Sequence, residues 1–114
     1  MDTTSIGREA ESSVAKYMEC RGYKLVEQNW RTRWCEIDLV MTKKDVVYFI
    51  EVKYRKSTYY GDPFEYITPK KLRQMKFAAE YWLGINTWKG ESTILAASLT
   101  EGQITPVIID LYND

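Results

Sequence analysis

Acidic side chains and a lysine interrupt two apolar segments in the middle of the chain. Asp38 lies in the segment CEIDLVM, and Glu51 and Lys53 lie at the end of VVYFIEVK. Carboxylate and carbonyl oxygens are the ligands that Mg²⁺ and Mn²⁺ prefer in proteins. A lysine beside such an ion can orient or deprotonate a water molecule, or neutralise charge on a phosphate. The pattern therefore predicts Mg²⁺- or Mn²⁺-dependent phosphodiester hydrolysis, with Asp38, Glu51 and the backbone carbonyl of Val52 as metal ligands.

The two segments are joined by TKKD, which predicts a hairpin. A tight turn over these four residues pairs Glu36 with Glu51 and Asp38 with Phe49, so that Asp38 lies diagonal to Glu51. Lys53 follows Glu51 by two residues and points to the same face of the sheet. We therefore expect the acidic residues and Lys53 to gather at one end of the hairpin. The alternative is a solvated ladder of salt bridges on a sheet edge.

Histidine is absent from the 114 residues. This excludes His-based acid–base catalysis, Ser-His-Asp and Cys-His nucleophiles, and imidazole zinc sites. Cys20 and Cys35 have no metal-ligand spacing and are expected to be reduced thiols. The N-terminus lacks a signal-peptide pattern, and no apolar run approaches the roughly 18 residues that span a bilayer. We therefore expect a single cytoplasmic domain over residues 1–114, without a membrane partner.

The formal net charge is zero, but the charges are unevenly distributed along the chain. Residues 30–76 carry eleven Lys and Arg against six Asp and Glu, whereas the rest of the chain carries five against ten. A basic middle between acidic ends can form a basic face, which suits nucleic acid. The alternative is that these cations solvate turns and a helix surface.

The apolar periodicity predicts a first helix over residues 5–21, with Thr3 or Thr4 capping its start. Glu9 and Glu11 lie on opposite flanks of its apolar face. Helix geometry alone does not choose which of the two glutamates points toward the hairpin.

A second helix is predicted over residues 69–84, with Thr68 as its cap, a proline at its first position and Gly84 at its end. Lys70 and Lys71 lie in its first turn. Cations there oppose the helix dipole, and a bound phosphate would offset that cost. The alternative is an ordinary solvated helix face.

Strands are predicted at residues 23–28, 36–41, 46–54, 92–99 and 104–109, the last two joined by the turn EGQ. The run VVYFIEV is apolar on both faces until Glu51, as in a central strand that is covered on both sides. The order of elements predicts an α/β sandwich with a mixed sheet.

Aromatic residues gather in two places beside cations. Tyr59, Tyr60, Phe64 and Tyr66 occupy a predicted loop beside Arg55 and Lys56, and Trp30 and Trp34 flank Arg31 and Arg33. Nucleic-acid bases can stack on such residues. The alternative, which we favour for the loop, is that the aromatic rings pack beneath it as a small satellite core.

The hairpin motif is specific enough to indicate a family. CEIDLVM…VVYFIEVKYR resembles the GEIDLI…FVEVK.R core of the YraN family, a set of small proteins in the restriction-endonuclease-like PD-(D/E)XK superfamily. VAKYMECRGYKLVEQNWR and YYGDPFEYITPKKLRQMKFAAEYWL are similar to the flanking segments of that family, so the resemblance covers about residues 7–83. The chain departs from the family pattern at Ala10, Cys35 and Thr93, where glycine, glycine and aspartate are usual.

The resemblance implies a fold and a site. The fold is a three-layer α/β/α restriction-endonuclease-like domain with a central mixed sheet. Asp38 and Glu51 would be the metal ligands and Lys53 the catalytic lysine. Glu11, in preference to Glu9, would project from the first helix toward the metal. Arg55 and Lys71 would be phosphate contacts near the site. Independently of the resemblance, Lys56 and Lys70, which adjoin them in the sequence, are also expected to bind nucleic acid.

The function expected on these grounds is that of a metal-dependent DNA nuclease, with branched or damaged DNA as candidate substrates. A homodimer would let so small a chain cut both strands of a duplex. The rival expectation is a non-catalytic nucleic-acid-binding or interaction module that keeps the nuclease fold. A purely structural assembly subunit has less support in the sequence.

Overall fold

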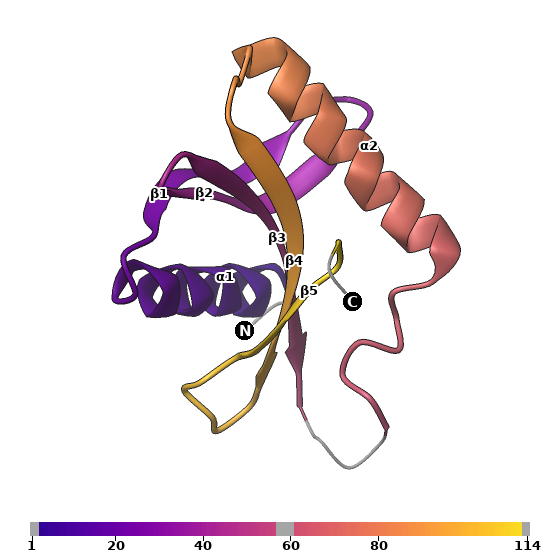
Figure 1. Cartoon of the computed structure of the whole chain (residues 1–114). Helices are drawn as coiled ribbons and strands as arrows, with labels where there is room; N and C mark the ends of the chain where they lie inside the picture. Colours follow the sequence, from indigo (N-terminus) through magenta and orange to yellow (C-terminus); the bar gives the residue numbers. More distant parts are fainter. Residues whose placement is uncertain (1–2, 57–60, 113–114) are drawn as a thin grey trace.

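A five-stranded mixed sheet lies between two helices in the computed structural model, which describes residues 3–56 and 61–112. The elements are α1 (Thr3–Glu19), β1 (Lys24–Arg31), β2 (Glu36–Lys43), β3 (Val46–Arg55), α2 (Pro69–Asn86), β4 (Glu91–Thr100) and β5 (Val107–Asp110). The strand order is β1-β2-β3-β4-β5, with only β3 and β4 parallel (Figure 1). This arrangement confirms the predicted α/β class and is compatible with a restriction-endonuclease-like fold.

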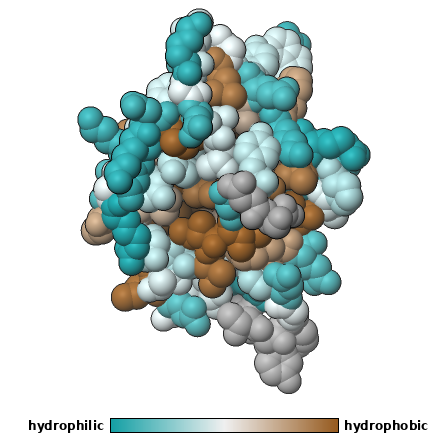
Figure 2. All heavy atoms as spheres, in the orientation of Figure 1, coloured by the Kyte–Doolittle hydropathy of each residue, from teal (hydrophilic) through white to brown (hydrophobic). Residues whose placement is uncertain are grey.

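Each helix covers one face of the sheet with its own apolar cluster. Under α1, Val14 packs with Leu39 and Ile50, and under α2, Trp82 packs with Phe49. Burial of each large apolar side chain stabilises the fold by about 1.5–3 kcal/mol. On the face shown in Figure 2, apolar atoms gather in the middle, over β5, and hydrophilic atoms surround them. Neither helix of the described segments is long and apolar enough to cross a membrane.

Helix α1 is shifted toward the N-terminus relative to the prediction of residues 5–21. It ends at Glu19 because Gly22, with φ of 92°, closes a tight turn in which its N–H donates to the Glu19 carbonyl at 3.0 Å. Thr3 and Thr4 lie inside the helix, so the prediction that one of them caps its start is wrong.

Helix α2 begins as predicted but ends later. Thr68 is the N-cap and accepts a hydrogen bond from the Lys71 N–H, and the proline occupies the first turn. The prediction that Gly84 ends the helix is wrong, because the helix continues to Asn86. The left-handed residue is Thr87, with φ of 46°, and its N–H donates to the Gly84 carbonyl. A glycine inside a helix costs only about 1 kcal/mol, so it does not force termination.

The hairpin between β2 and β3 has a different register from the predicted one. Its turn contains only Lys44 and Asp45, with φ of 50° and 65°. Positive φ at both positions is the two-residue geometry whose twist matches that of the strands. Val40 therefore pairs with Phe49, and the predicted pairing of Asp38 with Phe49 is wrong. The register differs by two residues, so the alternation of faces is retained.

The outer strands also differ from the prediction at their ends. Strand β1 extends to Arg31, three residues beyond the prediction, and contains a bulge between Leu25 and Glu27. Strand β5 begins at Val107 and not at residue 104, because Pro106 precedes it and lacks the N–H that a ladder requires. The strands β4 and β5 pair in the antiparallel sense, as predicted.

Gly90, just before β4, is expected to tolerate no side chain. A Cβ atom there would overlap the backbone oxygen of Asp45 and lie 3.0 Å from Nε1 of Trp88. Gly90→Ala should therefore lower the free energy of unfolding by about 1–3 kcal/mol in urea titrations. Gly84→Ala is the matched control: it has open space inside α2, so it should stabilise the protein by about 0.5–1 kcal/mol. Equal effects of the two substitutions would contradict this packing.

Candidate active site

Strands β2 and β3 part beyond the pair Leu39–Ile50, and Asp38 occupies the gap between them. Oδ2 of Asp38 accepts a hydrogen bond of 2.8 Å from the N–H of Val52. In a continued ladder Val52 would exchange hydrogen bonds with Ile37, so both its N–H and its C=O are directed toward β2. The backbone carbonyl of Val52 therefore faces the same gap as the Asp38 carboxylate.

Asn29 lies opposite Asp38. It explains why the side chains of β1 and β2 stop alternating between the two faces of the sheet at this point. It has φ of 54°, a left-handed conformation that asparagine adopts more readily than most residues. Trp30 and Ile37, the next pair along, belong to the core under α2, whereas Leu39 belongs to the core under α1. The kink thus turns Asp38 toward the gap. Sequence reasoning missed Asn29, whose only signal was an asparagine within a strand.

Glu11 reaches this kink from α1, whereas Glu9 is exposed to solvent. The Glu11 side chain is 9% exposed, and its Oε1 has no hydrogen-bond partner among the described residues. Burial raises the pKa of Glu11, and hydrogen bonds to Asp38 and Asn29 act in the opposite direction. A contact between two carboxyl groups requires a shared proton or a nearby cation. The structure therefore places Glu11, and not Glu9, against Asp38.

Asp38 has the most strongly shifted carboxyl group at the site. Burial, followed by the neighbouring charge of Glu51, raises its pKa from 3.8 to about 7, although the Val52 N–H partly opposes the rise. The observed register explains this coupling, because it moves Asp38 from the diagonal position to the position opposite Glu51. At neutral pH the Asp38 carboxyl group is therefore close to half protonated, and a cation that bound there would displace the proton.

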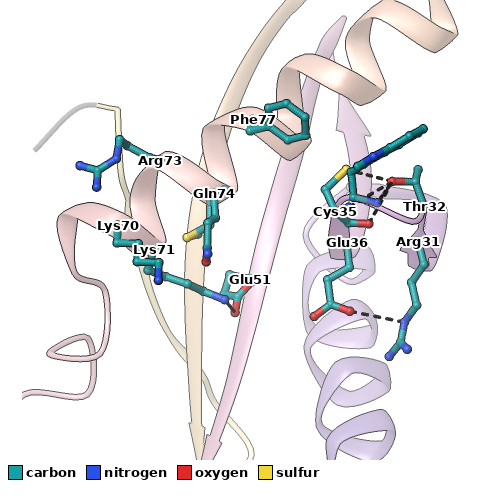
Figure 3. Close-up of a pocket in the computed structure, with 12 residues that line it drawn as sticks. Arg31, Thr32, Cys35, Glu36, Glu51, Lys70, Lys71, Arg73, Gln74 and Phe77 are labelled. Atoms are coloured by element: carbon teal, nitrogen blue, oxygen red, sulfur yellow. Dashed lines mark hydrogen bonds and ion pairs between the residues drawn. The ribbon is translucent and has the colours of Figure 1, made fainter.

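Glu51 is held by a lysine from α2. Nζ of Lys71 lies 3.0 Å from Oε1 of Glu51, with 33% and 20% of the two side chains exposed (Figure 3). The ion pair is only partly screened by water, so Lys71 offsets charge that Glu51 would otherwise add beside Asp38. Lys71 was predicted as a phosphate contact, and here it contacts a predicted metal ligand.

Lys53 and Tyr66 form the side of the site nearest the loop. Lys53 Nζ lies 5.3 Å from the centroid of the Tyr66 ring. The Tyr66 hydroxyl is buried without a hydrogen-bond partner in the described segments, and burial together with the charges of Glu51 and Asp38 raises its pKa. Sequence reasoning placed Tyr66 in an aromatic loop and did not connect it with the carboxylates. Tyr59 and Tyr60 of that loop lie outside the described residues.

A cleft of about 800 Å³ opens beside Glu51, between α2 and the turn that joins β1 to β2 (Figure 3). Its cationic lining residues are Arg31, Lys70, Lys71 and Arg73. Glu36 is also in the lining, where it pairs with Arg31 at 3.5 Å in an exposed contact. The predicted pairing of Glu36 with Glu51 is wrong, because the register of β2 with β3 differs from the predicted one by two residues.

The predicted nucleic-acid contacts divide into two groups. Lys70 and Lys71 line the cleft. Arg55 ends β3 and Lys56 follows it, and neither lines the cleft within the part of the chain that the structure describes.

The donor atoms fit a magnesium-type ion better than a softer metal. Over residues 3–56 and 61–112, no three His, Cys, Asp or Glu side chains are grouped so that they could hold a metal together. Mg²⁺ needs only one or two carboxylates and keeps several waters. Asp38, Glu51 and the Val52 carbonyl meet that need, and the unpartnered Oε1 of Glu11 provides a buried acceptor for a water. The predicted ligand set is therefore chemically suitable.

The departure from the family motif at Thr93 lies away from this cluster. Thr93 pairs with Tyr48, three residues before Glu51, and donates a hydrogen bond of 3.0 Å to Asp110. Its hydroxyl joins β4 to β5 and does not take part in the carboxylate cluster.

Comparisons with known proteins agree with the motif. Residues 10–109 match the model of "Uncharacterised protein family UPF0102". A UPF0102 protein of Syntrophomonas wolfei is 44% identical over 68% of this chain and 68% of its own length, and one of Leifsonia xyli is 40% identical over 68% and 65%. A UPF0102 protein of Cytophaga hutchinsonii is 32% identical over 97% of this chain and 98% of its own length. The chain therefore belongs to UPF0102, the family that its hairpin motif resembles under the name YraN.

Proposed function

We propose that this protein is a metal-dependent nuclease that hydrolyses phosphodiester bonds in DNA, with branched or damaged DNA as candidate substrates. One observation carries the proposal: Asp38 is coupled electrostatically to both Glu51 and Glu11, and Glu51 lines a cleft with cationic walls. Such an arrangement is costly for the fold alone. It is useful where a cation and a phosphate bind together.

In this proposal, one group of site residues would bind the metal ion and another would bind the phosphate. Asp38, Glu51 and the Val52 carbonyl would hold Mg²⁺ or Mn²⁺, which supplies charge stabilisation at a phosphoryl oxygen and lowers the pKa of bound water. Oε1 of Glu11 accepts a hydrogen bond from water and orients it. Lys53 donates hydrogen bonds to the phosphate and balances the charge that develops there.

Lys71 links the two tasks in this proposal. It neutralises Glu51 at 3.0 Å, so it holds the position of a cation before an ion binds. A divalent ion held by Glu51 would weaken the attraction between Glu51 and Lys71, so that Lys71 would be available to a phosphate in the cleft. Lys70 lies beside it in the same cleft and adds a second contact.

The alternative is a nucleic-acid-binding or interaction module without catalysis. The ion pair between Lys71 and Glu51 favours it, because a lysine that neutralises the cluster permanently would make a metal unnecessary. A homodimer stays a prediction, which the number of strands cut in a duplex would test.

Lys53→Met tests the reaction. Wild-type protein with Mg²⁺ or Mn²⁺ is expected to cleave at least one member of a panel of single-stranded, duplex, flap and four-way DNA, and to cleave none with EDTA. Lys53→Met should slow cleavage about 100-fold or more, because it removes the proton donor and positive charge that this proposal assigns to the phosphate.

The matched control is Lys24→Met. It replaces an exposed lysine at the start of β1, the end of the strand away from Asn29 and the site. It should cleave as the wild type does. Equal cleavage rates for both variants would contradict the role of Lys53. Failure of the wild type to cleave any substrate, with metal shown to bind, would leave the non-catalytic module as the better account.

A further inference from the structure

The outer part of the cleft carries aromatic rings that the metal site does not use. Trp34, from the turn between β1 and β2, and Phe77, from α2, both line the cleft. They are 64% and 50% exposed. Tyr81 lies between them, with its ring centroid 5.9 Å from that of Trp34 and 6.1 Å from that of Phe77. The two exposed rings therefore rest on a shared support and leave apolar surface open to solvent.

The position of Trp34 is fixed by its own turn. Oγ1 of Thr32 accepts hydrogen bonds of 3.1 Å from the N–H groups of Trp34 and Cys35, and the Thr32 N–H donates to the Cys35 carbonyl at 2.9 Å. A turn closed in this way presents its side chain with little conformational entropy left to lose. The backbone that carries the exposed indole is thus ordered before any ligand arrives.

Cations accompany these rings. Lys70 and Arg73 line the same cleft and make no ion pair with any residue that the structure describes. The Arg33 guanidinium lies 5.5 Å from the centroid of the Trp34 ring. Rings that accept bases, beside cations that accept phosphates, are the two components of single-strand binding sites.

We infer that this cleft binds unpaired nucleotides, with bases stacked on Trp34 and Phe77 and phosphates held by Lys70 and Arg73. A duplex keeps the faces of its bases stacked on one another, so only an unpaired strand offers them to Trp34. The cleft begins at Glu51, so the same strand would lead to the proposed metal site. Calling this strand the substrate rests on the proposed function, whereas its binding does not.

A protein partner is the other candidate for the aromatic surface. The centre of a protein interface is depleted in lysine. Here Lys70 and Lys71 share the cleft with the two rings, so the mixed lining favours a polyanion. If the partner is a second copy of this chain, Trp34→Ala and Phe77→Ala should change the oligomeric state of the protein.

The test uses full-length protein in EDTA, at 50 mM salt, with fluorescently labelled DNA. Wild type should bind a single-stranded 12-mer about 100-fold more tightly than the same backbone without bases. Trp34→Ala and Phe77→Ala should each weaken binding to the 12-mer about tenfold and leave binding to the abasic strand unchanged. Lys70→Ala should weaken binding to both strands, because it removes a phosphate contact.

Ile85→Ala is the matched control, because Ile85 is 59% exposed on α2 and does not line the cleft. It should bind as the wild type does, and Trp34→Phe should restore most of the affinity. Equal affinity of wild type for the normal and abasic strands would overturn the inference. So would a dimer that Trp34→Ala dissociates without changing DNA binding. Because no cleavage is measured, a failed nuclease assay leaves this result standing.

Discussion

Glu51→Gln is expected to abolish the rise in melting temperature that Mn²⁺ gives the wild type. Ligand at 100 times its dissociation constant stabilises a folded protein by about 2.7 kcal/mol. Glutamine keeps the size of Glu51 but replaces its carboxylate with a neutral amide, whose oxygen is a much weaker ligand for Mg²⁺ and Mn²⁺. We therefore expect the metal-dependent stabilisation to vanish and DNA cleavage to fall by about 1,000-fold or more.

Lys71→Met distinguishes the effect of losing the negative charge of Glu51 from the effect of losing its ion pair. Both substitutions break the 3.0 Å contact between Lys71 and Glu51, but only Glu51→Gln removes a ligand. Lys71→Met should therefore retain the Mn²⁺ response and bind the ion more tightly, because the competing ammonium is gone. Glu36→Gln, at an exposed ion pair, should change neither quantity. A Mn²⁺ response that survives in Glu51→Gln would end the case for a metal site at this position.

The elements and the proximity of Asp38 to Glu51 could be predicted from local patterns. Apolar periodicity located both helices, and the hairpin brought Asp38 near Glu51. The predicted place of Lys53 on the same face stays a prediction, because its described contact is with Tyr66. The pairing could not be predicted as reliably, because it depends on turn geometry. TKKD permits both a four-residue and a two-residue turn, and the positive φ angles of Lys44 and Asp45 select the second. The resulting two-residue shift brings Asp38 opposite Glu51 and explains the coupling between them.

The residues that sequence reasoning missed depend on contacts between distant segments. Asn29 is separated from Asp38 along the chain, and only the pairing of β1 with β2 brings them together. Tyr66 comes from a loop whose composition also suited a satellite core. No spacing of residues in the sequence indicated that its ring would approach Lys53. The turn that orients Trp34 depends on Thr32, a residue with no motif of its own. Local patterns thus identified the acidic residues of the site but not the residues that position or surround them.

Asp38→Asn should make the metal-free protein less sensitive to pH. Below about pH 4 the Asp38 carboxyl group is protonated in both the folded and the unfolded chain. Between 3.8 and about 7 the folded chain keeps the proton and the unfolded chain loses it. The free energy of unfolding therefore falls as pH rises through this window, by about 1.4 kcal/mol per pH unit and by about 4 kcal/mol in total.

Asparagine cannot ionise, and its amide oxygen can still accept the Val52 N–H. Urea titrations in EDTA should therefore show Asp38→Asn to be more stable than the wild type at pH 8, with the advantage shrinking toward pH 4. Asp45→Asn, in the exposed turn of the hairpin, should follow the wild-type curve. Mg²⁺ at pH 8 should stabilise the wild type and Asp45→Asn but not Asp38→Asn, because the ion replaces the proton that Asp38 has lost. Parallel pH curves for wild type and Asp38→Asn would show that this carboxylate is not strained, and the physical reason for a cation in the gap between β2 and β3 would then disappear.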